Sequence, residues 1–136
     1  MNLFTHLNFP GNCADAFHYY EQNLGGRILA LMKQSDAPGA SGKANGHDPV
    51  LHARLELGKT VLIGNDVPPD RIQPMRSAYL YLSVDSVEEA ERIYAALMQG
   101  GEAFMPLQET YFASRFSQLR DQFGTLWTLI QERQMS

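Results

Sequence analysis

The stretch Asn2-Leu-Phe-Thr-His-Leu-Asn-Phe9 decides the fold, because its pattern returns 75 positions later as Ser77-Ala-Tyr-Leu-Tyr-Leu-Ser-Val84. Each extended run leads into a helix-like segment, and these segments stop at Gly25-Gly26 and at Gly100-Gly101. Glycine readily adopts the left-handed conformation that ends many helices. Three further extended runs follow each helix. The sequence therefore predicts a βαβββ unit written twice, and such a repeat governs how the whole chain is read.

The first half shows the local patterns most clearly. Alternation predicts strands at 2–9 and 50–57, and apolar spacing of three to four residues predicts a helix that begins after its N-cap Asn12. Extended runs at 27–32 and 60–63 complete this half. On the strand at 50–57, one face is expected to hold Leu51, Ala53, Leu55 and Leu57, and the other His52, Arg54 and Glu56.

The second half repeats this order. Ser86 and Glu89 form a capping box that marks the start of its helix. Extended segments are expected at 103–107, 110–120 and 126–130. The apolar stripe of the helix is expected to consist of Val87, Ala90, Tyr94 and Leu97.

Composition narrows the class of protein. The chain has 136 residues, of which 44% are hydrophobic and 19% charged, as in an ordinary globular domain. A net charge of -4 argues against nucleic acid and anionic membranes as partners, since both attract clustered Lys and Arg. The single cysteine, Cys13, excludes an internal disulfide, and no run approaches the ~18 apolar residues of a membrane span. We therefore expect a cytoplasmic protein.

The repeat also predicts the architecture. One helix can cover only one face of its sheet, so the other face stays open unless another part closes it. We expect an α+β fold in which two βαβββ modules, about 1–66 and 77–132, are joined by a Pro-rich linker within one domain. The expected curved mixed sheet surrounds a trough, and a concave surface of this kind suits a small-molecule ligand. Open strand edges favour a homodimer.

Several segments in this order resemble the PhnB-like members of the vicinal oxygen chelate superfamily, which includes glyoxalase I, extradiol dioxygenases and bleomycin resistance proteins. They are Phe9-Pro-Gly-Asn-Cys-Ala-Asp-Ala-Phe-His-Tyr-Tyr20, Leu24-Gly25-Gly26, His52-Ala53, Asn65-Asp66, Met105-Pro-Leu-Gln-Glu-Thr-Tyr-Phe-Ala113 and Asp121-Gln-Phe-Gly-Thr-Leu-Trp127. The resemblance implies the glyoxalase/bleomycin-resistance fold. PhnB-like proteins are often labelled as methyltransferases, but the sequence has no Gly-rich loop after a parallel strand to hold a nucleotide-like methyl donor.

The resemblance also implies where a divalent metal ion would bind. In catalytic members, His and Glu on the first and last strand of each module hold the ion. The matching positions here are His6, Leu62, Tyr79 (or Tyr81 in another register) and Thr128. A catalytic ion usually needs three N, O or S ligands, and only His6 is an ordinary one. We expect a degenerate site in which His6 is either a metal ligand or a hydrogen-bonded histidine without metal.

Other candidate residues keep two interpretations. His52 either orients a ligand or belongs to a polar strand face or dimer surface. The segment 108–116 either forms a pocket wall or is a core hairpin whose Arg115 meets an acidic neighbour, and Trp127 is either core or trough floor. The expected ligand-binding residues are His6, Tyr79, Tyr81, Gln108, Phe112, Arg115, Trp127 and Thr128.

Two functions follow from these patterns. The first is a protein that binds a small molecule in the trough, around a degenerate metal site. The alternative is a metal-dependent lyase, isomerase or dioxygenase with an altered ligand set around His6.

Overall fold

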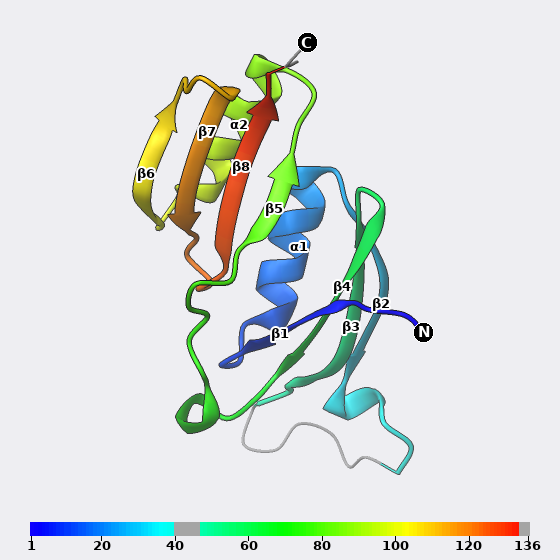
Figure 1. The fold of residues 1–136 in the computed structure, drawn as a ribbon. Coiled ribbons are helices and arrows are strands. Elements are labelled where there is room, and N and C mark those ends of the chain that lie inside the picture. Colours follow the sequence, from blue (N-terminus) through cyan, green and yellow to red (C-terminus); the bar gives the residue numbers. More distant parts are fainter. Residues whose placement is uncertain (40–46, 134–136) are drawn as a thin grey trace. The chain divides into compact units, whose positions relative to one another are not determined.

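The computed structural model describes residues 1–39 and 47–133. The chain divides into two compact units, Met1–Gln73 and Pro74–Ser136, and each contains one helix and a four-stranded mixed sheet (Figure 1). The predicted α+β class and the repeated βαβββ order are confirmed, with the strands arranged as two separate sheets. Among the described residues, no helix is long and apolar enough to cross a membrane.

Unit 1 forms a sheet with the strand order β1-β4-β3-β2. Strands β1 and β4 run parallel, and the other neighbours are antiparallel. Short 3-10 turns lie at Gln34–Asp36 and Pro69–Arg71. The main elements are β1 (Thr5–Phe9), α1 (Cys13–Leu24), β2 (Arg27–Lys33), β3 (Val50–Leu57) and β4 (Thr60–Asp66).

Helix α1 covers one face of this sheet. At Gly64 on β4, an added Cβ would lie only 2.6 Å from Phe17 Cζ and 3.1 Å from Cys13 Sγ. Glycine is therefore required there, because it lets the helix approach the strand closely. Gly25 ends the helix with a φ of 78°, as predicted. The fully buried helix residues are Cys13, Ala16, Phe17 and Tyr20.

The structure corrects one predicted face of β3. Val50 is 1% exposed, whereas Leu51, which alternation placed in the core, is 47% exposed. The strand register explains why Val50 and not Leu51 is buried. Met32 pairs with His52, but the next residue of β2, Lys33, pairs with Val50, which leaves Leu51 as an extra residue. The extra residue forms a β-bulge, which reverses the alternation on its far side.

Unit 2 repeats the arrangement with the strand order β5-β8-β7-β6. Strands β5 and β8 are parallel, as are their counterparts in unit 1. The Ser86 half of the predicted capping box is present, because the Glu89 amide donates to Ser86 Oγ at 3.0 Å; the Glu89 carboxylate accepts from the Asp85 amide. The elements are β5 (Leu80–Ser83), α2 (Val87–Leu97), β6 (Glu102–Gln108), β7 (Ala113–Arg120) and β8 (Leu126–Glu132).

The core of unit 2 differs from the predicted stripe at two positions, because Val87 and Tyr94 are only half-buried. Ile93 is 2% exposed, whereas Tyr94, expected in the stripe, is only half-buried. Ala90 and Leu97 are buried as predicted. Ile93, together with the two confirmed residues, continues the i, i+3, i+7 spacing of one helical face, so the core takes the purely aliphatic side chain.

Candidate functional site

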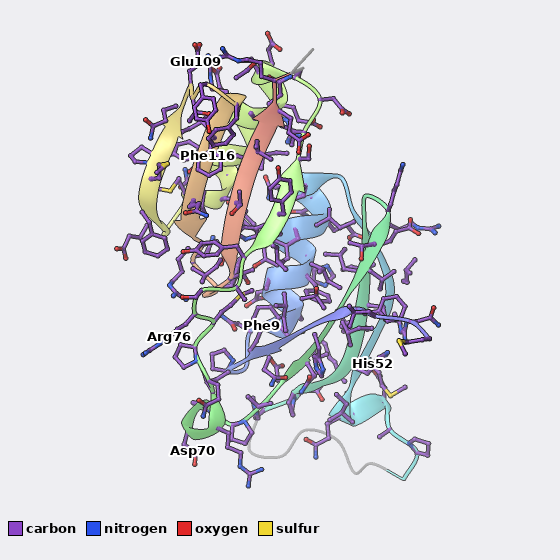
Figure 2. The ribbon with its side chains drawn as sticks, viewed as in Figure 1. Phe9, His52, Asp70, Arg76, Glu109 and Phe116 are labelled. Carbon is purple, nitrogen blue, oxygen red and sulfur yellow. The ribbon has the colours of Figure 1, made fainter. Side chains whose placement is uncertain are left out.

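The face of unit 1 that α1 does not cover carries polar and charged side chains, including two histidines and an arginine. Register places His6, Ile63 and Arg54 in one row across β1, β4 and β3. Alternation turns these side chains away from the core residues Leu7 and Leu55, which face α1. We call this surface the helix-free face of unit 1, and it comprises Phe4, His6, Asn8, His52, Arg54, Glu56, Ile63 and Asn65. His52 is labelled in Figure 2.

On this face, His6 is hydrogen-bonded to Asn65. The bond joins His6 Nε2 to Asn65 Oδ1, while Asn65 Nδ2 donates to the Asp66 carbonyl at 3.1 Å. This second bond fixes the amide orientation, so His6 Nε2 is the donor and Nδ1 is left as an acceptor in the neutral ring. His6 is exposed and Asn65 half-buried. The pair presents an ordered acceptor nitrogen to the surface.

A second group lies on β3. Arg54 Nε donates to His52 Nε2 at 3.2 Å, and the Arg54 guanidinium carbon lies 5.7 Å from the centre of the Phe4 ring. Both β3 side chains are half-buried. The bond and the cation–π contact together hold the guanidinium in place.

One of the four positions that the resemblance assigned to metal ligands, Leu62, does not lie on the helix-free face. Leu62 is 3% exposed, and its alternation on β4 places it toward α1; Ile63 is its neighbour on the helix-free face. His6 already uses Nε2 in the bond to Asn65. Across residues 1–39 and 47–133, no group of three His, Cys, Asp or Glu side chains could hold a metal ion. This donor set does not fit a divalent ion.

In unit 2, the ion pair between Arg115 and Glu91 identifies the face that α2 covers. Arg115 Nη2 lies 3.3 Å from Glu91 Oε1 of α2, so the acidic-neighbour interpretation of Arg115 describes the structure. Trp127 is 1% exposed and donates from Nε1 to Asp121 Oδ2 at 2.9 Å. Trp127 pairs with Leu119, which shares the α2-facing side of β7 with Arg115. These two predicted ligand contacts therefore lie on the covered side of the sheet.

The opposite face of unit 2 carries other predicted residues. Tyr81 and Thr128 are paired across β5 and β8, and Gln118 Nε2 donates to Thr128 Oγ1 at 3.2 Å. Tyr81 is 60% exposed and donates to Glu132 Oε1 at 2.7 Å, a bond that raises the pKa of the phenol. Tyr79, half-buried, directly precedes β5.

Phe112 and Gln108 lie near the ends of β7 and β6. Phe112 packs edge-on against Phe116 and Tyr111, with ring centres 5.2 Å and 5.3 Å apart. Gln108 pairs with Phe116 in the sheet, and its side chain donates back to the Pro106 carbonyl. This aromatic group, in which Phe116 is labelled in Figure 2, is separate from the Arg115 ion pair because Arg115 and Phe116 point to opposite faces.

Sequence reasoning missed Asn65 as a member of the site. The signal was present, because Asn65-Asp66 was one of the segments in the resemblance and lies at the end of an alternating strand. The sequence also did not predict the hydrogen bond between Arg54 and His52, which lie two positions apart on one strand face. Cys13 has no such role: it is fully buried, and burial raises its pKa to about 12.

Comparison with known proteins places the chain in a family. Residues 4–129 match the model of the glyoxalase/bleomycin resistance protein/dioxygenase superfamily. The chain belongs to this superfamily. It is 28% identical to the Escherichia coli protein YjdN over 95% of this chain and 94% of that protein. It is 36% identical to protein PA1353 from Pseudomonas aeruginosa, whose crystal structure matches with a TM-score of 0.86 over 98% of this chain and 99% of that one.

A PhnB protein from Bacillus cereus shares the fold at 22% identity, with a TM-score of 0.82 over 96% of this chain and 99% of that chain. The superfamily and fold predicted from the sequence are therefore confirmed, and a PhnB protein is among the fold neighbours.

Proposed function

We propose that the chain binds a small molecule on the helix-free face of unit 1. The observation that carries this proposal is the pair of ordered polar groups, His6–Asn65 and His52–Arg54, on either side of the half-buried Ile63. Ligand sites commonly combine apolar surface with a few well-placed polar groups.

The side chains of this face are ordered before a ligand arrives. Asn65 is held through both ends of its amide, and Arg54 is held by His52 and Phe4. Binding to such groups costs less conformational entropy than binding to freely rotating side chains.

A ligand-observed NMR screen tests the proposal with a library of neutral and charged aromatic fragments. The variant Ile63→Trp adds bulk between His6 and Arg54, so bound fragments should lose affinity at least tenfold. Phe104→Trp adds similar bulk at an exposed residue of β6 and should leave binding unchanged. The proposal fails if no fragment binds, or if the two variants have equal effects.

We also propose that the chain forms a homodimer in the cytoplasm. Strands β2 and β6 are edge strands, and β2 exposes Leu29 and Met32, 44% and 46% accessible. Edges of this kind pair readily with a second chain. Light scattering should give about twice the chain mass of 15.3 kDa, and Leu29→Glu should lower it. A single-chain mass for the unaltered protein would contradict the dimer.

A further inference from the structure

Arg54 is a half-buried cation that has no acidic partner among the described residues. Ion pairs in the described part of the chain join Arg27 to Glu56, Arg115 to Glu91 and Arg133 to Glu109, and none of them involves Arg54. Glu56 lies two positions from Arg54 on the same strand face, but Arg27 neutralises it at 3.6 Å.

Most N–H donors of Arg54 are unused among the described residues. Of its five N–H groups, Nε–H is used by His52, which leaves the four on Nη1 and Nη2. The guanidinium carbon lies 5.7 Å from the centre of the Phe4 ring, which is a cation–π distance, and a guanidinium donates in its own plane. The Phe4 ring carries no oxygen that would compete for these donors, so the end-on pair of nitrogens can bind two oxygens of one anion.

His52 adds a further donor on the same strand. Its Nε2 accepts from Arg54 and so carries no proton, which places the proton of the neutral ring on Nδ1. The half-buried imidazole thus supplies one further N–H to the same face. Neither residue contributes an acceptor that would repel an anion.

The local charge has the opposite sign to that of the chain. The whole sequence has a net charge of -4. The helix-free face carries the charged residues Arg54 and Glu56, and Arg27 of β2, which pairs with Glu56, adds a second positive charge beside them. The carboxylate of Asp66 does not counter them, because it accepts from the Cys13 and Val50 amides, whose side chains lie in the α1-facing core.

We propose that the ligand of this face is an oxyanion, a carboxylate or phosphate group bound end-on by Arg54 and hydrogen-bonded by His52. This inference rests on the proposed function, since it names the ligand class of the same surface. An ordered guanidinium without a carboxylate binds such a group more strongly than neutral donors do. Ile63 and Phe4 then contact the apolar part of the ligand.

The test is a titration of isotopically labelled protein with sodium benzoate, inorganic phosphate and neutral benzamide at constant ionic strength. Benzoate or phosphate should shift the Arg54 Nε and His52 ring signals to saturation, and benzamide should bind at least tenfold more weakly than benzoate. Arg54→Met should lower the anion affinity at least tenfold, about 1.4 kcal/mol. Arg71→Met removes an exposed charge of the same unit and should have no effect.

Unchanged amide signals of the buried α1 residues Phe17 and Tyr20 verify that Arg54→Met keeps its fold. Arg54→Lys, which keeps the charge without the fork, should retain part of the affinity. The inference is overturned if neither anion saturates, if Arg54→Met binds as the unaltered protein does, or if benzamide binds as well as benzoate. Neutral fragments that still bind this face would leave the proposed function standing. Absence of any binding would remove both.

Discussion

His6 and Asn65 are separated by 59 positions in the sequence, yet their side chains are hydrogen-bonded across the neighbouring parallel strands β1 and β4. The register pairs His6 with Ile63, so Asn65 reaches back by one side-chain step along its own face. This bond makes His6 a fixed donor at Nε2 and an acceptor at Nδ1. It places the histidine in a hydrogen-bonded group within a proposed ligand site.

Replacing Asn65 should release His6. In Asn65→Ala, the His6 ring loses its acceptor, and its nitrogen chemical shifts should change from one dominant tautomer to a mixture. The free energy of unfolding should fall by about 1 kcal/mol, the usual size of one hydrogen bond. Asn8→Ala, at an exposed residue of β1, is the control and should leave the His6 tautomer unchanged. A His6 spectrum that is the same in both variants would contradict the assigned bond.

Metal binding should not depend on His6. The donor set around it does not fit a divalent ion, so calorimetry of chelator-stripped protein with Zn²⁺ or Mn²⁺ should give no one-to-one binding that His6→Ala removes. His18→Ala, at an exposed residue of α1, controls for weak surface binding. One equivalent of bound metal that is lost only in His6→Ala would instead support the metal-dependent enzyme.

Cys13 should make stability fall at alkaline pH. Burial first, and then the nearby Asp66 carboxylate, raise the thiol pKa from 9.0 to about 12. Below pH 9 the thiol is protonated in both states; between 9 and 12 it ionises only in the unfolded chain, which favours unfolding. Urea denaturation should therefore show a steeper loss of stability from pH 9 upward in the unaltered protein than in Cys13→Ala. Parallel curves would contradict burial of the thiol.

Asp121 should be essential for the turn before β8. Its Oδ1 accepts from the Phe123 and Thr125 amides at 2.9 Å and 3.0 Å, and its Oδ2 accepts from Trp127. Asp121→Ala leaves buried donors without this partner and should cost roughly 3 kcal/mol or more, measured by the fluorescence of the single tryptophan. Asp70→Ala, at an exposed carboxylate, should stay within about 0.5 kcal/mol. Equal effects would argue against this role.

Local patterns in the sequence were enough for the repeat and the element order. Alternation in β1, the left-handed Gly25 and the capping residue Ser86 each depend on neighbours within a few positions. These signals are short-range, so they can be read without knowing what packs against them. The same holds for Cys13, whose place in the helix stripe predicted its burial.

The errors arose where a partner strand or helix decides the outcome. The bulge that buries Val50 and exposes Leu51 is set by the register with β2. The orientation of Leu62 toward the helix is set by the register with β3. The bonds of His6 with Asn65 and of Arg115 with Glu91 join residues 59 and 24 positions apart. Residue spacing along the chain contains no record of such pairings, so the site could be narrowed to a strand face but not assembled.

The most direct measurement of the central claim is the set of nuclear Overhauser contacts between a bound fragment and assigned methyl groups. We predict contacts to the Ile63 methyls on the helix-free face, and none to Leu55, which is fully buried against α1, or to Leu129 in the core of unit 2. Contacts confined to residues outside the helix-free face of unit 1 would contradict the account.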